Sequence, residues 1–408
     1  MIVRKIKPEE LKRTNELFAI AFESELDNTK SADLVYEEAI SNPDSRDNIY
    51  CMERWAAFED DDKTMISNFV ATPFTVQFDG HHCKMVGIGG VATLPQYRRM
   101  GGIRECFKAS LPDMYEKGIS FSYLYPFSTA YYRKFGYEMC CERYRYQIRI
   151  SSIRPFSLEG NCYLIENESP ALNDIKQIYS VWQEKYNMMT VNEDFEFAWV
   201  KNSNPVKDQR FTYVYKSKDG IAKGYMTFFK EDSTNGRNLK CSRFFFTDAE
   251  GFHGLLNLAY TCASDHQYIT FELPTNLDIT LVLPEWSMGA GQCEKVYCGM
   301  ARVVNVIKVL EMAKYKGSGS LVIKVIDALV PENNNTFLLH YKNGKAIKVS
   351  TTEEPEDISL GISDFSRLII GACDTSAIPY MEAVQVHTTV EKLSNVFYRK
   401  LTLITEYF

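Results

Sequence analysis

The stretch "GGVATLPQYRRMGG", residues 89–102, decides the fold of the first part of the chain. It opens as a β-rich run, passes Pro95, and closes on two arginines, a methionine and two glycines. The segment that follows, "IRECFKASLPDMYE", places apolar side chains at helical spacing. The stretch therefore predicts a strand, a tight turn and the start of a helix.

The predicted turn has the chemistry of an anion site. The first N–H groups of a helix have no partner within the helix and carry partial positive charge. Gly101 and Gly102 leave the backbone open to a phosphate group, and Arg98 and Arg99 add positive charge. The spacing matches neither the Gly-x-x-x-x-Gly-Lys-Ser/Thr loop nor the Gly-x-Gly-x-x-Gly fingerprint. By itself, the motif indicates either a pyrophosphate site or a solvated surface loop.

The composition limits the classes of protein to which the chain can belong. Its 408 residues are too many for one core, so we expect two or three domains. The hydrophobic content of 45% and the charged content of 24% are typical of a globular protein. The net charge of -7 argues against a nucleic-acid partner and is compatible with a cationic substrate. No run approaches the ~18 apolar residues that a membrane span needs, so we expect a cytoplasmic protein without a membrane partner.

The cysteines and histidines show no metal-binding pattern. The eleven cysteines form no Cys-x-x-Cys pair, and the six histidines have no ligand spacing. We therefore predict reduced, mostly buried thiols and no metal ion.

The order of predicted elements indicates an α/β (α+β) chain of three domains, at residues 1–150, 151–290 and 291–408. The first reads as strand, helix, three strands, helix, strand, short helix and strand. The second repeats this order but has "FFFTDAEGFHG" in place of the arginines and glycines, so we expect a degenerate copy that has lost its ligand. The third begins with a predicted helix over residues 301–315 and continues with antiparallel hairpins.

The run from Val91 to Ile103 resembles the coenzyme A loop of the GCN5-related N-acetyltransferases (GNATs). In that family a Val-x-x-x-Pro strand end leads into an Arg/Gln-x-x-Gly-x-Gly/Ala loop, whose amides hold the pyrophosphate. The segment "YYRKFGYE", residues 131–138, adds a second match. The resemblance implies a GNAT fold with acetyl-CoA as the cosubstrate.

The whole layout is similar to one branch of that family, the Eis (enhanced intracellular survival) acetyltransferases. Members share about this length, a Tyr-x-x-Phe-Gly-Tyr segment and an aromatic chain end, here "TEYF". The resemblance implies two tandem GNAT-fold domains, the second degenerate, followed by a sterol-carrier-protein-like α+β domain. It also implies a homo-oligomer, often a hexamer.

The resemblance assigns the cosubstrate site. The backbone N–H of Val91 is implied to contact the thioester oxygen, a role that needs no particular side chain. Ile103 stands where the family usually has a small residue. The residues implied to line the pantetheine and the pyrophosphate are Thr93, Arg98, Arg99, Gly101, Gly102 and Ile103.

The resemblance also assigns the chemical groups. Tyr132 matches the general acid, because a phenol with a pKa near ~10 can protonate a thiolate and is neutral at pH 7. The adjacent Tyr131 is the alternative acid, and simple core packing is the structural alternative for Tyr132. The terminal carboxylate of Phe408, which is ionised at pH 7, is implied to be the general base.

The acceptor side is assigned less directly. By resemblance, Tyr125 and Phe127 line the acceptor pocket at the end of the fifth strand. Glu25, one of several acids just after the first helix, is a candidate for attracting a cationic substrate, although such acids are mostly solvated.

Three functions are compatible with these patterns. The first is an acetyl-CoA-dependent N-acetyltransferase that acts on primary amines such as aminoglycosides, polyamine-like molecules or lysine side chains. We expect direct transfer, because no cysteine lies within the motifs to carry the acetyl group. The second is a lipid or sterol carrier that uses the third domain, and the third is an acetyl-CoA-binding sensor without turnover.

Overall fold

The computed structural model describes residues 1–42, 48, 50–166, 171–191, 197–233, 236–281, 283, 285–287 and 289–406. The chain divides into two compact units. The first unit combines residues 1–141 with residues 298–408, and the second contains residues 142–297. We describe each unit separately.

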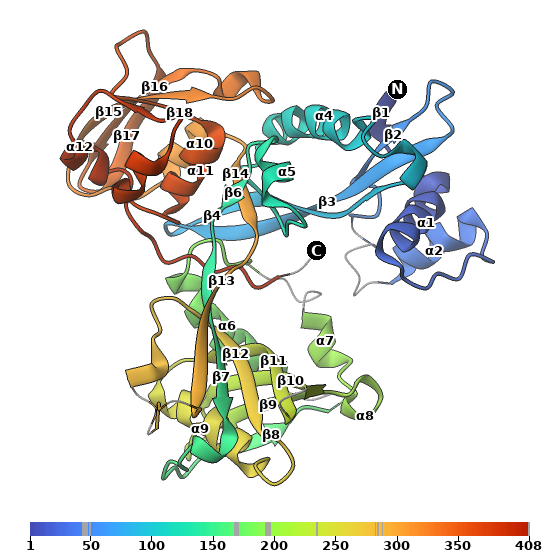
Figure 1. Ribbon diagram of the computed structural model, residues 1–408, viewed down its shortest axis with the longest axis vertical. Coiled ribbons are helices and arrows are strands. Elements are labelled where there is room, and N and C mark those ends of the chain that lie inside the picture. The colour runs from blue at the N-terminus through green and yellow to red at the C-terminus, as the bar shows by residue number, and fades with distance from the viewer. Residues whose placement is uncertain are drawn as a thin grey trace. The chain divides into compact units, whose positions relative to one another are not determined.

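The first unit contains a seven-stranded sheet that starts at the N-terminus (Figure 1). The strand order is β1-β2-β3-β4-β5-β14-β6, and only β4 and β5 run parallel. The strands are β1 (Ile2–Lys5), β2 (Arg54–Phe58), β3 (Met65–Phe78), β4 (His81–Thr93), β5 (Phe121–Leu124), β6 (Glu138–Met139) and β14 (Met300–Val303).

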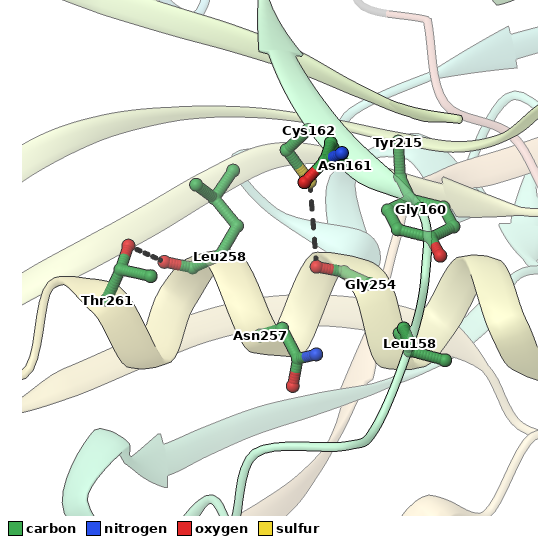
Figure 2. Close-up of a pocket in the computed structure, with 9 residues that line it drawn as sticks. All are labelled: Leu158, Gly160, Asn161, Cys162, Tyr215, Gly254, Asn257, Leu258 and Thr261. Carbon is green, nitrogen blue, oxygen red and sulfur yellow. Dashed lines mark hydrogen bonds between the residues drawn. The ribbon is translucent and has the colours of Figure 1, made fainter. Parts of the chain in front are cut away.

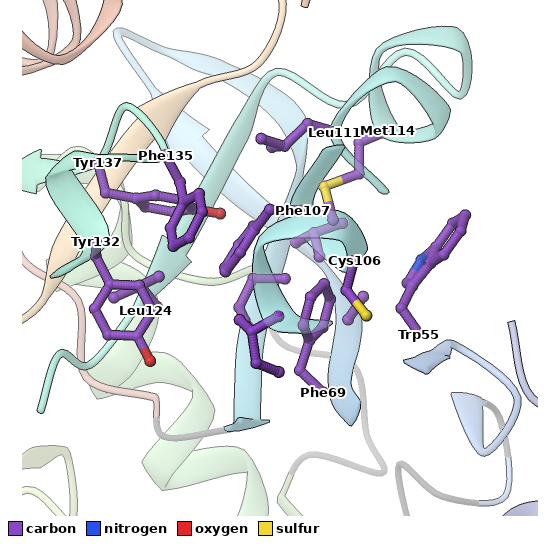
Figure 3. Packing of buried hydrophobic residues seen from close by; sticks show 14 of the residues in the cluster. Trp55, Phe69, Cys106, Phe107, Leu111, Met114, Leu124, Tyr132, Phe135 and Tyr137 are labelled. Carbon is purple, nitrogen blue, oxygen red and sulfur yellow. The ribbon is translucent and has the colours of Figure 1, made fainter. Parts of the chain in front are cut away.

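Helices cover both faces of this sheet because the side chains of its strands alternate between two apolar clusters. On β2, Trp55 and Ala57 belong to the cluster that contains Phe107 of α4 (Figure 3). Ala56 and Phe58 belong to the cluster that includes residues of the first helix. The helices are α1 (Leu11–Phe22), α2 (Ala32–Ser41), α4 (Gly102–Glu116) and α5 (Thr129–Arg133).

The sixth strand of each large sheet comes from a distant part of the chain. After β6 the chain leaves the first unit, and β7 (Glu142–Arg149) pairs with β12 and β13 of the second unit. After β13 the chain returns, and β14 inserts between β5 and β6 (Figure 1). The first stretch of the first unit therefore ends at residue 141, whereas the expected domain boundary was 150. Residues 300–303 then add β14 to the sheet of this unit. The crossing segments pair with each other through the Cys298 N–H and the Cys141 carbonyl at 2.9 Å.

The second unit repeats the topology of the first sheet. Its strand order is β8-β9-β10-β11-β12-β7-β13, and only β11 and β12 run parallel. This repetition confirms the predicted second copy of the fold. Its other strands are β8 (Asn161–Leu164), β9 (Arg210–Lys216), β10 (Ala222–Ser233), β11 (Gly236–Phe246), β12 (Tyr268–Pro274) and β13 (Gly291–Tyr297). Its helices are α6 (Ala171–Lys185), α7 (Ala198–Lys201), α8 (Pro205–Asp208) and α9 (Ala249–Thr261).

The C-terminal part of the first unit is an α+β domain with a five-stranded sheet in the order β17-β16-β15-β18-β19. Its strands are β15 (Gly319–Ile326), β16 (Thr336–Lys342), β17 (Lys345–Thr351), β18 (Ile358–Gly361) and β19 (Gln385–Val386). Its helices are α10 (Val306–Met312), α11 (Ile362–Ile370) and α12 (Val390–Ser394).

The predicted helix over residues 301–315 was wrong at its start. Residues 300–303 form β14 instead, because all four side chains are buried where the strand lies between β5 and β6. The helix begins only after Asn305, whose side chain accepts a hydrogen bond from the Lys308 N–H at 3.0 Å.

Two general properties complete the description. All eleven cysteines are free, and most are buried or partly buried. Among helices within the described ranges, none is both long enough and apolar enough to cross a membrane.

Candidate active site

The parallel strands β4 and β5 of the first sheet pair over only part of the length of β4. Their pairing runs from Met85 with Phe121 to Ile88 with Leu124. Beyond Ile88, β4 continues to Thr93 and pairs only with β3 among the described strands. The backbone of β4 beyond Ile88 therefore has no partner on its β5 side among the described strands.

A β-bulge lies on β4 just beyond Ile88, its last residue paired with β5. The β3 partners change from Asn68 with Ala92 to Val70 with Gly89, so Gly90 and Val91 lie opposite one residue of β3. Gly90 has a φ of 57°, in the left-handed region that favours glycine. A bulge leaves its extra residue outside the ladder, which is the condition for the Val91 N–H to serve a ligand. The side chain of Phe18 on α1 also lies close to Gly90, at 3.4 Å from an ideal Cβ position.

The turn after β4 carries the arginines that the sequence singled out. Arg98 and Arg99 are exposed, and Arg99 has a φ of 71°, unusual for a residue with a side chain. Gly101, the N-cap of α4, has a φ of 89°. The guanidinium of Arg104 lies beside Gly101, 2.7 Å from an ideal Cβ position there. Arg104 was not predicted, although its position in the first turn of the helix was a usable signal.

Gly102 lets α4 pack directly on the sheet. An ideal Cβ at this position would lie 2.4 Å from Ser67 Oγ and 3.0 Å from Ser67 Cβ. Ser67 is fully buried on β3, and its hydroxyl is 3.0 Å from the hydroxyl of Thr93. The glycine therefore fixes the height of the helix N-terminus above the sheet. Sequence reasoning missed Ser67 because no local pattern marks a contact with residue 102.

The side chain of Ile103 belongs to the core cluster with Phe107 and Trp55. This side chain therefore lies in the core, and only the backbone N–H of Ile103 is available to bind an anion at the turn. This placement explains how a large residue replaces the small one that the family usually has. The helix N-terminus presents the N–H groups of its first residues, which have no acceptor within the helix.

An aromatic cluster joins α4 to the segment around α5. It consists of Phe107, Phe127, Tyr131, Tyr132, Phe135 and Tyr137. Tyr132 sits on α5, whose N-cap Ser128 accepts a hydrogen bond from the Tyr131 N–H at 3.3 Å. Tyr132 is only 2% exposed, but its hydroxyl points away from the rings of Phe107 and Phe135 (Figure 3). The ring is thus held by packing while the hydroxyl lies at the edge of the cluster.

The two tyrosines differ in their surroundings. Burial raises the pKa of Tyr132 well above its usual value of 10, and the neighbouring phenols of Tyr131 and Tyr137 raise it further. Burial also raises the pKa of Tyr131. The nearby Cys106 thiol of α4 raises this pKa further, and the Arg104 guanidinium lowers it. Both phenols therefore stay protonated at neutral pH. Tyr131 lies toward the N-terminal half of α4, whereas Tyr132 lies deeper in the cluster.

The C-terminal segment reaches the end of β5. The Tyr125 hydroxyl donates a hydrogen bond to the Glu406 carbonyl at 2.7 Å. Leu403 and Ile404 are buried, and the Thr402 hydroxyl donates to the Cys140 carbonyl at 3.2 Å. Tyr407 and Phe408 lie outside the described residues. The described part of the tail is nevertheless fixed against the first sheet.

A buried ion pair anchors this tail at its base. Lys400 contacts the carboxylate of Asp79, in the hairpin between β3 and β4, and both side chains are almost fully buried. Burial lowers the pKa of Lys400, and Asp79 opposes that shift. The Lys314 N–H also donates to Asp79 at 2.7 Å.

The remaining predicted acceptor residues are more exposed. Phe127 is 74% exposed, and its ring packs against Tyr131 and Tyr132 with centroids 5.3 and 5.4 Å apart. Glu25 is exposed in the segment between α1 and α2, and the described contacts do not connect it to the aromatic cluster. Within the described ranges, no group of three or more His, Cys, Asp or Glu side chains is placed to hold a metal ion.

Residues 2–140, which contain β4, the turn after it and the aromatic residues around α5, match the acetyltransferase (GNAT) domain family. The N-terminal part of the chain is a GNAT acetyltransferase domain. A GNAT domain uses acetyl-CoA as its cosubstrate. The part of β4 beyond Ile88, the turn with positive φ at Arg99 and Gly101, and the N-terminus of α4 provide the backbone groups that such a molecule needs. Residues 306–402 match the sterol carrier protein domain family.

Solved structures resemble the chain over its whole length. A probable N-acyltransferase from Enterococcus faecalis aligns with 100% of this chain and 99% of its own, at 21% identity and a TM-score of 0.82. A GCN5-related N-acetyltransferase from Anabaena variabilis covers 100% of both chains at 19% identity and a TM-score of 0.82. Eis1 from Mycobacterium abscessus covers 100% of both chains at 16% identity and a TM-score of 0.77. The predicted Eis-like architecture is confirmed at the level of the fold. No curated protein matched the chain in sequence.

The second GNAT-like sheet closes the position that binds an anion in such domains. The N-cap of α9 is Asp248, whose carboxylate accepts a hydrogen bond from the Gly251 N–H at 2.9 Å. Lys223 pairs with both Asp248 and Glu250. The helix start is thus already occupied by carboxylates that would repel a phosphate. The loss of ligand in this copy stays a prediction.

A pocket of about 290 Å³ lies elsewhere in the second unit, between β8, β9 and α9 (Figure 2). Its polar groups are used internally. The Cys162 thiol donates to the Gly254 carbonyl at 3.6 Å, and the Asn257 amide bonds both backbone groups of Phe156.

Proposed function

We propose that the protein transfers the acetyl group of acetyl-CoA to a primary amine, with Tyr132 as general acid and the C-terminal carboxylate of Phe408 as general base. The observation that carries the proposal is the hydrogen bond between Tyr125 and Glu406. It holds the end of the chain beside β5, next to the point where β4 and β5 stop pairing. Phe408 follows two residues later, and two residues span at most about 7 Å.

The cosubstrate is proposed to lie along the described turn. Arg98, Arg99 and the N–H groups of Gly101, Gly102 and Ile103 would bind the pyrophosphate, and Thr93 would border the pantetheine. The N–H of Val91, freed by the bulge, would donate to the thioester oxygen as negative charge develops there. Each of these groups supports a role in binding or polarisation that needs no movement of the fold.

The proposed chemistry deprotonates the acceptor amine and protonates the leaving thiolate. The Phe408 carboxylate accepts a proton from the ammonium group of the acceptor, directly or through water, and passes it to solvent. The amine nitrogen then forms a bond to the carbonyl carbon while the carbon–sulfur bond breaks. Tyr132 donates its phenolic proton to the leaving thiolate and recovers one from the nitrogen as the amide forms. The net products are the acetylated amine, free coenzyme A and one proton.

The raised pKa of Tyr132 supports its role as an acid rather than a base. A phenol that stays protonated well above pH 10 is available for donation throughout the neutral range. We infer that the acceptor is an aminoglycoside, a polyamine-like molecule or a lysine side chain, bound near Tyr125 and Phe127, with Glu25 as a more distant attraction. We propose direct transfer because neither sequence motif of the site contains a cysteine, and Cys106 of α4 is fully buried.

The C-terminal domain supports an enzyme more than a lipid carrier. Its interior is filled by buried side chains such as Ile323, Leu339 and Phe365. A carrier would need a continuous apolar cavity in that place. Homohexameric assembly, which the resemblance implies, and the cytoplasmic location expected from the sequence belong to the same proposal. Light scattering of the purified protein tests the assembly.

The proposal is tested by free-thiol release in the Tyr132→Phe variant, with Tyr131→Phe as the matched control on the same helix. Loss of a general acid should lower kcat by about 100-fold or more with little change in the KM for acetyl-CoA. The control should retain most of its activity. A large loss in Tyr131→Phe and none in Tyr132→Phe would move the acid to Tyr131. Coenzyme A binding without turnover for any amine would favour a sensor.

A further inference from the structure

We propose that Arg302, on the inserted strand β14, is a positioning residue for Tyr132, and that Asp327 of the C-terminal domain holds Arg302 in place. This inference rests on the general-acid role proposed for Tyr132. It gives the C-terminal part of the chain a second task in the reaction, in addition to supplying Phe408.

Arg302 is buried against the turn that follows α5, the helix that carries Tyr132. Its side chain is 1% exposed, and its Nη1 donates a hydrogen bond to the Phe135 carbonyl at 2.5 Å. Gly136 has a φ of 82°, and an ideal Cβ there would lie 2.2 Å from the same nitrogen. The chain after α5 is therefore folded closely around the guanidinium group.

The loop bound by Arg302 is the one that fixes the backbone of Tyr132. The Phe135 N–H donates to the Tyr132 carbonyl at 2.9 Å, and the Tyr137 N–H donates to it at 3.4 Å. Helix α5 has five residues, and a helix of that length is unstable without tertiary contacts. A cation near the C-terminal end of a helix is also electrostatically favourable. Arg302 thus stabilises the turn whose geometry sets the position of the phenol.

Asp327 fixes Arg302 from the opposite side. Its carboxylate accepts a hydrogen bond from Arg302 Nη2 at 2.5 Å and one from Asn333 Nδ2 at 3.0 Å. Its other oxygen accepts the N–H groups of Leu329 at 3.0 Å and Val330 at 3.2 Å. The carboxylate is 1% exposed and has four donors, so its orientation is fully determined.

The stability of the fold alone does not explain the buried Arg302–Asp327 ion pair. A buried ion pair can often be replaced by apolar residues without loss of stability, whereas removing one partner alone is costly. What apolar residues cannot replace is the bond to the Phe135 carbonyl. We therefore expect the pair to matter for the placement of Tyr132, where a shift of about 1 Å can change a rate by about 100-fold.

The test compares Arg302→Met/Asp327→Asn, which removes both charges together, with Arg302→Lys, which keeps a charge for Asp327 but lacks the fork. Each is made with Tyr132 present and in a Tyr132→Phe background, and the readouts are thermal unfolding, acetyl-CoA binding and kcat for amine acetylation. With Tyr132 present, kcat should fall by roughly 10- to 100-fold while the Kd for acetyl-CoA stays within twofold. In the Tyr132→Phe background, the same changes should cause no further loss. Lys392→Met, which breaks the Lys392–Asp357 pair in the same domain, is the control and should leave kcat unchanged.

Two results would overturn the inference while leaving the proposed function intact. One is a normal kcat in both Arg302 variants when Tyr132→Phe alone is inactive. The other is an equal fold-loss with and without Tyr132, which would show that Arg302 acts independently of the phenol. If Tyr132→Phe alone is fully active, the general-acid assignment fails and this inference fails with it.

Discussion

Replacing Gly102 by alanine tests whether the contact of α4 with the sheet sets the cosubstrate site. The new Cβ would lie 2.4 Å from Ser67 Oγ and 3.0 Å from Ser67 Cβ. Ser67 is fully buried and bonded to Thr93, so it cannot move aside easily. We expect the N-terminus of α4 to lift from the sheet instead.

The size of the effect follows from this overlap. Ordinary contacts of a Cβ begin at 3.4 Å, so the 2.4 Å approach to Ser67 Oγ must lengthen by about 1 Å. Overpacking of this kind costs about 1–3 kcal/mol. For a folding unit of this size, that corresponds to a fall in Tm of roughly 2–12 °C. Loss of one hydrogen bond from a helix N–H to a phosphate costs about 1.5–3 kcal/mol, or about 10- to 100-fold in the Kd for acetyl-CoA.

Thermal unfolding and calorimetric titration with acetyl-CoA measure the two effects. The matched control is Gly102→Ala combined with Ser67→Gly, which removes both close atoms and leaves the Ala57 Cβ at an ordinary 3.5 Å. The double variant should recover most of the affinity. Unchanged Tm and Kd in Gly102→Ala would refute the reasoning, as would a loss of affinity that Ser67→Gly does not repair.

Three further predictions follow from the same unit. Tyr125→Phe removes the bond to Glu406 and should lower kcat by more than it changes the KM for acetyl-CoA, and steady-state kinetics giving a normal kcat would count against the fixed tail. Asp79→Asn leaves Lys400 buried without its counter-charge and should lower the free energy of unfolding by about 3–5 kcal/mol in urea titrations, where an unchanged midpoint would contradict the pairing. For Glu138, burial raises the pKa, but hydrogen bonds from Arg133 and the Met139 N–H outweigh it and lower the pKa below the usual 4.5. Its contribution to stability is therefore present above about pH 4.5 and lost as the pH falls through the folded-state pKa, and Glu138→Gln should flatten this dependence in urea titrations between pH 3 and 6.

Part of this fold could be read directly from the sequence. The run 89–102 predicted the strand, the turn and the helix start because its glycines and arginines act locally, within one turn of chain. The short helix predicted near the end of the first domain is α5, which Ser128 caps and which ends at Arg133, ahead of Gly136 with its φ of 82°. The repeated order of elements predicted the second copy of the fold.

The exchange of strands between the two sheets could not be predicted in this way. Residues 300–303, Met-Ala-Arg-Val, are all buried and too few to show an alternation, so the sequence suits a buried strand and a buried helix equally. Only the pairing with β5 and β6 decides between them, and those partners are more than 150 residues away in the sequence. Arg302, Asp327 and Ser67 were missed for the same reason: each acts through a partner that no local pattern identifies.

The central claim is acetyl transfer to an amine with a base at the chain end. The most direct test measures free-thiol release from acetyl-CoA with kanamycin, spermidine and a lysine peptide, using the protein and a variant extended beyond Phe408. The account predicts turnover with at least one amine and a loss of at least about 100-fold in the extended variant, with its unfolding transition unchanged. Equal turnover by both proteins would remove Phe408 from the mechanism, and no turnover with any amine would contradict the proposed function.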